Sequence, residues 1–266
     1  MMTPAINIAA TFLYLAASAY VLIALLKKTS VNKEVLIGVS IAALVAHGFG
    51  VGSQLFTEHG YNLGFFVALS LITWVVNLLV LVSGLRLPLH NLFVLLFPLS
   101  AAIVVATIAA HQPLKANTSL TPGMISHILL SILAYSLLTI AAFQSLLLAW
   151  QNHQLRNKHT MGRVRLLPPL QTMETLLFDM LWAGQLFLTI SIVSGFLYLE
   201  DMFGQSLAHK TILSLFAWCL YSILLWGRHW LGWRGNSAIR WTLAGFCTLM
   251  VAYFGSKLVL EIILGR

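Results

Sequence analysis

Nine histidines stand out in a chain of 266 residues of which only 8% are charged. Three of them, His47, His127 and His209, lie within or at the start of long apolar segments. A neutral imidazole is a strong axial ligand for haem iron, and two imidazoles on facing helices can hold one haem between them. A lone histidine in an apolar helix can equally hydrogen-bond to a neighbouring helix. Both interpretations, iron ligand and interhelical contact, stay open for each of the three.

Two polar residues follow His127 at helical spacing. Ser131 is four residues further along and Tyr135 eight, so all three lie on one face of a helix. Such an arrangement could hold one tautomer of the imidazole through a supporting hydrogen bond. The alternative is that Ser126 and Ser131 form a small-residue face for packing against another helix.

Two carboxylates, Glu174 and Asp179, bracket the start of a later apolar segment. Arg228 and the loop arginines Arg163 and Arg165 are expected on the same side of the membrane. An ion pair that fixes the positions of the helices is the favoured interpretation, and a path for protons or cations is the lesser one. No second carboxylate and no chain of titratable groups crosses the middle of the segments, which disfavours a transporter.

The elements that must position these residues are membrane spans. Hydrophobic residues make up 59% of the chain, and a span needs roughly twenty consecutive apolar residues. The sequence therefore predicts an all-α polytopic membrane protein with one integral membrane domain over residues 1–266. Its eight spans are expected at about 5–26, 35–53, 63–85, 89–110, 123–150, 175–199, 208–226 and 239–260.

The basic residues predict the orientation of the spans. Of the 15 Lys and Arg residues, eleven fall near alternate loops, at 27–34, 86–88, 151–174 and 227–238. The positive-inside rule places these loops in the cytoplasm and both termini outside. The first span also lacks the charged start and cleavage site of a signal peptide. Five histidines then lie toward the outer side: His47, His59, His111, His127 and His209.

Several classes of function lack support in the sequence. The net charge of +8 is accounted for by membrane insertion, so no nucleic-acid partner is expected. Cys219 and Cys247 both lie inside spans, and without a Cys-x-x-Cys motif they support no disulfide framework, covalent haem attachment or zinc site. No nucleophile with its base, carboxylate pair or phosphate loop is present, so we expect no enzyme and no catalytic residues.

Ordered motifs over residues 120–260 resemble the transmembrane cytochrome c assembly family that includes CcsA and CcmC. The nearest resemblance is to its eight-span branch of inner-membrane YpjD-like and HemX-like proteins. The motifs are His127 to Tyr135, Leu167 to Phe178, Gly184 to Phe196, His209-Lys210-Thr211, Trp218, Gly227-Arg228, Gly232 to Gly235 and Ala252 to Lys257.

The resemblance implies a multi-pass protein of the bacterial inner membrane that binds or handles non-covalent haem and assists cytochrome c biogenesis. By position, His127 matches the histidine that opens the family's span before a tryptophan-rich outer loop. His209 and Lys210 fall at the tail of that loop, and His47 is a further candidate ligand. No metal other than haem iron is implied. The implied partners are the lipid bilayer, haem and, in addition, other cytochrome c assembly proteins or apocytochrome c.

The corresponding loop of this chain differs from the family pattern. The segment from Tyr198 to His209 contains no tryptophan, and Tyr198 and Phe203 are its only aromatic residues. This difference supports an alternative function, a non-catalytic membrane scaffold or accessory protein that stabilises another membrane complex. A histidine-ligated haem could also transfer electrons, so a redox role with a quinone or a thiol stays open.

Overall fold

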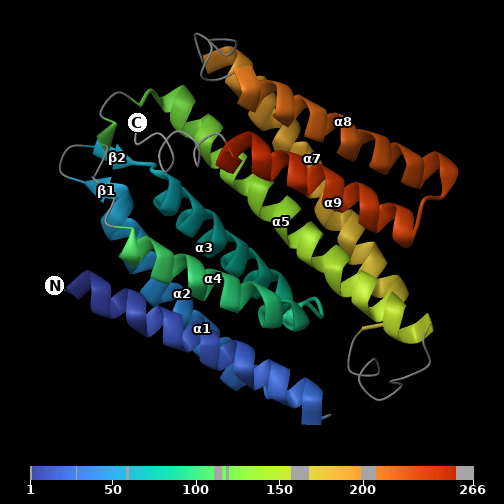
Figure 1. Cartoon of the computed structure of the whole chain (residues 1–266), viewed down its shortest axis with the longest axis horizontal. Coiled ribbons are helices and arrows are strands. Elements are labelled where there is room, and N and C mark those ends of the chain that lie inside the picture. Colours follow the sequence, from blue (N-terminus) through green and yellow to red (C-terminus); the bar gives the residue numbers. More distant parts are fainter. Residues whose placement is uncertain are drawn as a thin grey trace. The chain divides into compact units, whose positions relative to one another are not determined.

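The fold is all-helical apart from three very short strands, as the apolar segments predict (Figure 1). The computed structural model describes residues 2–27, 29–57, 60–110, 116–117, 120–156, 168–198 and 208–255. Within these ranges eight helices are long and apolar enough to cross a membrane. The prediction of a polytopic membrane protein with eight helical spans is therefore confirmed. The orientation with both termini outside stays a prediction.

Each predicted span coincides with one helix or with a helix and an adjoining turn. Residue 199 and residues 256–260, at the ends of the sixth and eighth predicted spans, lie outside the described residues. The helices are α1 (Met2–Lys27), α2 (Lys33–Leu55), α3 (Phe65–Gly84), α4 (Phe93–Ala109), α5 (Pro122–Arg156), α7 (Leu170–Tyr198), α8 (Ala208–Leu231) and α9 (Asn236–Met250). A 3-10 turn, η1 (His90–Leu92), precedes α4, and a π-helical turn, η2 (Val251–Gly255), continues α9.

Three helices extend five residues or more beyond a predicted end of their spans. α5 and α8 continue past the predicted ends at 150 and 226, and α7 begins before the predicted 175. Hydropathy detects only the apolar part of a helix, whereas backbone hydrogen bonds continue into the polar residues beyond it. α7 starts directly after Pro168 and Pro169. Prolines are expected to end any preceding helix, so they predict that the sixth span begins after them.

The helices divide into two compact units, which we describe separately. Unit 1 comprises Met1–Ser119 with Gln154–Pro168, and unit 2 comprises Leu120–His153 with Pro169–Arg266. In unit 1, α1 packs against both α2 and α4. Its core contains the stacked rings of Phe93 and Phe97, whose centroids lie 4.3 Å apart. The expectation of one integral membrane domain stays a prediction.

A three-stranded antiparallel sheet closes one end of unit 1. Its strands are β1 (Phe56–Thr57), β2 (Gly60–Asn62) and β3 (Ala116–Asn117), in that order. Tyr61 pairs with Phe56 on one side and with Asn117 on the other. The segments that follow α2 and α4 therefore meet at the same end of the unit, as two antiparallel pairs of spans require.

Unit 2 contains α5, α7, α8 and α9, with α8 packed against both α7 and α9. The helices alternate in direction, so the start of α5, the end of α7 and the start of α8 lie at one end of the unit (Figure 1). We call this the His127 end. The start of α7 and the turn from α8 to α9 lie at the opposite end, where Glu174 and Arg228 are found.

Replacing Gly245 by Ala is expected to destabilise unit 2 by about 1 to 3 kcal/mol, the usual cost of overpacking a core. A Cβ atom added at Gly245 lies 2.7 Å from the ring of Tyr221, which is fully buried. Thermal unfolding of the detergent-purified protein, followed by circular dichroism, measures the change.

The matched control is Gly38→Ala in α2, where an added Cβ meets no atom within 4 Å. This change is expected to be neutral or stabilising by up to about 1 kcal/mol, because Ala favours the helix more than Gly does. Equal melting temperatures for the two variants would show that Tyr221 moves aside without cost.

Candidate functional site

His127 faces α7 from the second turn of α5. It lies five residues after Pro122, the first residue of the helix, or about 7.5 Å along the helix axis. The imidazole is partly buried. Its Nδ1 lies 2.9 Å from the carbonyl oxygen of Ser191 and 3.1 Å from Oγ of Ser194.

These contacts determine the tautomer of His127. A carbonyl oxygen can only accept a hydrogen bond, so Nδ1 carries the proton and donates it to Ser191. The Ser194 hydroxyl itself donates to the same carbonyl at 2.8 Å, which leaves its oxygen lone pairs toward Nδ1. Nε2 of the neutral ring then carries the lone pair. Histidines that bind metals usually have this arrangement, with one nitrogen free to coordinate and the other donating to a fixed acceptor.

The serine and tyrosine predicted to support His127 have other partners. Ser131 donates to the His127 carbonyl oxygen at 2.8 Å, and its Oγ lies 2.6 Å from Oγ of Ser191. Tyr135 donates to the carbonyl oxygen of Leu249 at 3.2 Å. Ser131 therefore links α5 to α7, as expected if it belongs to a small-residue packing face. The imidazole of His127 is held by residues of α7 instead.

Sequence reasoning missed Ser191 and Ser194 as the partners of His127. Their signal was present, because the two serines are three residues apart and are followed by Gly195. Such small-residue faces are typical of close contacts between membrane helices. The pattern indicates a contact face but does not identify the residue that packs against it.

Other polar and aromatic groups lie at the His127 end. The ring of Tyr198, the last residue of α7, packs against Gly123 in the first turn of α5. His209 is exposed in the first turn of α8. Beside it, Lys210 places Nζ 5.8 Å from the ring centroid of Tyr253. Phe203 lies outside the described residues.

His47 lies in unit 1 and is almost completely buried, with 1% of its surface exposed. Its Nδ1 is 3.0 Å from the hydroxyl of Tyr14 and its Nε2 is 2.9 Å from Oγ of Ser70. Both ring nitrogens therefore take part in hydrogen bonds between α1, α2 and α3. Ligation by His47 stays a prediction, and it would require one of these bonds to break. His59 and His111 lie outside the described residues.

Replacing His47 by Leu is expected to destabilise unit 1 by about 2 kcal/mol, because two buried hydroxyls each lose a partner. The leucine side chain is close to the histidine side chain in volume, so the change removes the hydrogen bonds and largely keeps the packing. Chemical unfolding of the purified protein in mixed micelles measures the difference. The control is His153→Ala at the exposed end of α5. A loss no larger than that of the control would mean that the two hydroxyls find other partners.

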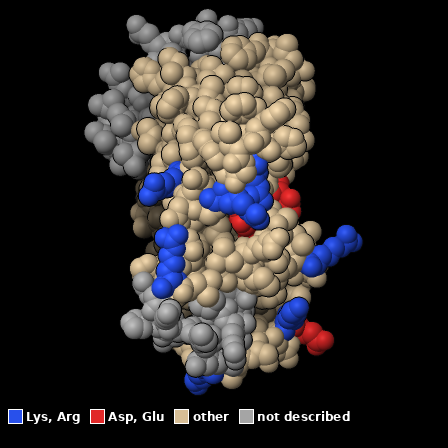
Figure 2. Space-filling view, turned by 90° about the vertical axis from the view of Figure 1, so that its right-hand side faces the viewer, with Lys and Arg blue, Asp and Glu red and all other residues tan. Residues whose placement is uncertain are grey.

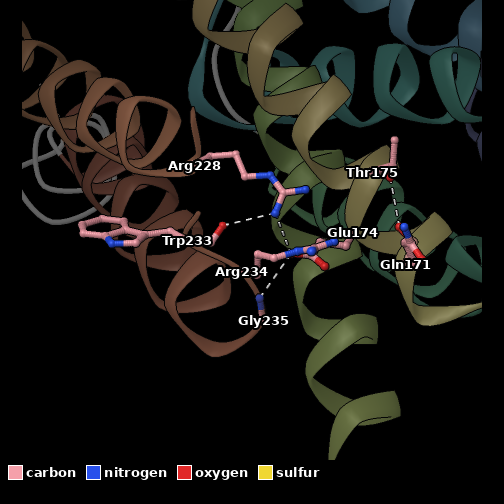
Figure 3. Close-up of polar contacts among 7 residues, drawn as sticks. All are labelled: Gln171, Glu174, Thr175, Arg228, Trp233, Arg234 and Gly235. Atoms are coloured by element: carbon pink, nitrogen blue, oxygen red, sulfur yellow. Dashed lines mark hydrogen bonds and ion pairs between the residues drawn. The ribbon is translucent and has the colours of Figure 1, made fainter. Parts of the chain in front are cut away.

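A second polar site lies at the opposite end of unit 2 (Figure 3). Oε1 of the buried Glu174 lies 3.2 Å from Nη1 of Arg228, 3.5 Å from Nε of Arg234 and 3.3 Å from the backbone nitrogen of Gly235. We call these four residues the Glu174 cluster. Arg228 also lies over the ring of Phe178, 4.5 Å from its centroid.

The structural ion pair expected of this region is therefore formed by Glu174, which ties α7 to α8 and to the start of α9. Asp179, for which an ion pair was also expected, does not form one with any described residue. It is exposed on α7. Five residues separate it from Glu174, so it lies on a different face of the helix. Arg163 and Arg165 lie outside the described residues.

Comparison with known proteins identifies the family. The family model described as "Cytochrome C assembly protein" matches residues 5–264. This chain belongs to the cytochrome c assembly family. The resemblance found in the motifs is thereby confirmed, and it extends over the first four helices as well.

Among its relatives is the Inner membrane protein YpjD of Escherichia coli (strain K12), 31% identical over 98% of this chain and 99% of the relative. Protein HemX of Brevibacillus brevis is 23% identical over 58% of each chain. The cytochrome c biogenesis protein CcsA of Prochlorococcus marinus (strain NATL1A) is 29% identical over 34% of this chain and 29% of the relative. No solved structure matches the chain. With its eight apolar helices, this member of the cytochrome c assembly family is a multi-pass inner membrane protein.

Proposed function

We propose that this protein binds haem at the His127 end of unit 2 and handles it during cytochrome c assembly, without carrying out covalent chemistry itself. The observation that carries the proposal is the hydrogen bond from Nδ1 of His127 to the Ser191 carbonyl oxygen, at 2.9 Å. It directs the lone pair of Nε2 away from α7 in a partly buried ring. Family membership supplies the context, since CcsA is named for cytochrome c biogenesis.

In this proposal His127 is the first axial ligand of the haem iron. Ser191 and Ser194 hold the ring in the coordinating tautomer, which raises the basicity of Nε2. His209 is the proposed second ligand, because it lies at the same end of unit 2 and its side chain is exposed. Lys210, whose ammonium group lies near Tyr253, provides a positive charge for an acidic haem propionate.

We propose that the His127 end of unit 2 faces the outer side of the inner membrane. The loops expected in the cytoplasm follow α5 and α8, whereas the His127 end contains the start of α5 and the start of α8. Haem held there would be presented to partners on the outer side of the inner membrane. Those partners would be apocytochrome c or other assembly proteins.

An absorption spectrum of the full-length protein tests the proposal. The protein is purified in mild detergent from haem-replete cells, and spectra are recorded oxidised, reduced and after titration with haemin. A Soret band with the sharp visible bands of a six-coordinate reduced haem is expected. A colourless preparation whose spectrum stays that of free haemin throughout the titration would overturn the proposal.

The scaffold function is favoured by one observation, the absence of tryptophan between Tyr198 and His209. A scaffold would co-purify with a stoichiometric membrane partner whether or not His127 is intact. Affinity purification of the wild-type and His127→Gly proteins, followed by mass spectrometry, separates the two functions. Loss of the partner together with haem supports the haem function, and an unchanged partner in a haem-free protein supports the scaffold.

A further inference from the structure

The Glu174 cluster contains more positive than negative charge. A single carboxylate oxygen is shared by two guanidinium groups and by the backbone N–H that precedes α9. The start of a helix adds a partial positive charge of its own. Among the described residues of unit 2 the only other carboxylate is Asp179, which pairs with neither arginine. The cluster therefore retains a net positive charge after its internal ion pairs are counted.

Several donors of the cluster make no contact with Glu174. Arg234 uses its Nε for Glu174, and its two terminal NH₂ groups make no hydrogen bond to any described residue. Its side chain is 56% exposed, and that of Arg228 is 26% exposed. A guanidinium with both terminal nitrogens available can bind a phosphate through two parallel hydrogen bonds.

The turn that presents Arg234 is held firmly. Gly232 and Gly235 have φ values of 66° and 55°, which lie in the left-handed region that glycine adopts readily. Between them, Trp233 donates its backbone N–H to the carbonyl oxygen of Gly227 at 3.1 Å. The Trp233 ring lies against Gly227 and 5.4 Å from the ring of Trp241. A ligand that binds Arg234 would therefore pay little entropic cost for ordering this turn.

The surroundings of the cluster are those of a membrane interface. The last turns of α8 expose Trp226, Trp230 and Leu231, and Trp230 is 72% exposed. Tryptophan at the end of a span is typical of the headgroup region of the bilayer. Figure 2 views the molecule from the side of the turn between α8 and α9, and near the middle of this view Lys and Arg side chains gather beside a few Asp or Glu side chains. A ligand of this site would have an anionic head beside an apolar tail.

We propose that the Glu174 cluster binds the phosphate headgroup of an anionic phospholipid through Arg234 and Arg228. Glu174 positions the two guanidinium groups through its contacts with Nη1 of Arg228 and Nε of Arg234. The terminal nitrogens of Arg234 then bind the phosphodiester, and the exposed tryptophans and Leu231 contact the acyl chains. Zwitterionic lipids carry a compensating ammonium group, so net charge selects the anionic lipid. This inference does not depend on haem binding.

Native mass spectrometry of the full-length protein tests the proposal. The protein is titrated with phosphatidylglycerol or phosphatidylcholine, and the dissociation constant of the first bound lipid is measured for each. A tighter first site for phosphatidylglycerol is expected in the wild-type protein. Arg234→Gln is expected to reduce this preference by about tenfold, more than the roughly fivefold that corresponds to about 1 kcal/mol for one basic residue near a charged surface.

The matched control is Arg240→Gln, since Arg240 is exposed in the first turns of α9 but lies outside the cluster. It is expected to change the preference less than twofold, and Arg234→Lys is expected to restore only part of it because lysine lacks the planar fork. Equal losses for Arg234→Gln and Arg240→Gln would overturn the proposal in favour of diffuse attraction. Displacement of the lipid by millimolar inorganic phosphate would overturn it in favour of a free phosphate site.

Discussion

Replacing His127 by Gly is expected to remove the Soret band of the purified protein. Haem affinity should fall by more than about 100-fold, since loss of an outer-shell partner of a ligand alone costs about 10- to 100-fold. The physical reason is that the lone pair of Nε2 is the proposed bond to iron, and the bond from Nδ1 to the Ser191 carbonyl oxygen is what leaves that lone pair on Nε2. Haemin titration followed by absorbance measures the change.

Rescue by imidazole distinguishes a lost ligand from a damaged fold. Free imidazole can occupy the space left in His127→Gly and is expected to restore the Soret band. His209→Ala is expected to convert a six-coordinate spectrum to a five-coordinate one if His209 is the second ligand. His153→Ala, at the exposed opposite end of α5, is the control and should leave the spectrum unchanged. A full, unshifted band in His127→Gly would exclude His127 as a ligand.

Replacing Glu174 by Ala is expected to have the largest effect on stability, about 3 kcal/mol. Removing one partner of a fully buried ion pair costs about 3 to 5 kcal/mol, and the partial exposure of Arg228 and Arg234 places this case at the lower end. The carboxylate is buried while both guanidinium groups depend on it, and the start of α9 loses the acceptor for the Gly235 N–H. Equilibrium unfolding in mixed micelles measures the loss.

Asp179→Asn is the matched control, because Asp179 is a carboxylate on the same helix that is exposed and pairs with no described residue. Its effect should stay below about 0.5 kcal/mol. A double-mutant cycle with Arg228→Met gives the coupling energy of the pair itself. If Glu174→Ala unfolded at the same denaturant concentration as Asp179→Asn, the cluster would contribute nothing to holding α7, α8 and α9 together.

The small sheet of unit 1 was not predicted from the sequence. Its strands contain two or three residues each, and β3 lies more than fifty residues beyond β2. Such short segments have no periodicity to detect, and their pairing depends on α2 and α4 ending side by side. The helical spans were predictable because each depends on its own run of apolar residues.

Some features of the candidate site were likewise predictable from the sequence and others were not. His127 and Glu174 were identified from residue type and position, because ionisable groups in apolar segments are rare. The sequence did not distinguish the paired Glu174 from the exposed Asp179, since the helix faces that meet α8 and α9 are not marked by hydropathy. It also did not distinguish His47, which has hydrogen bonds on both nitrogens, from His127.

By itself the sequence determined that this protein crosses the membrane eight times, that its basic residues gather in alternate loops, and that it resembles the cytochrome c assembly family. Each of these properties belongs to contiguous residues or to their order along the chain. Only the tertiary structure decided which nitrogen of His127 carries the proton. The acceptor lies 64 residues away on α7, and a tautomer is set by the atoms in contact with the ring rather than by its neighbours in sequence.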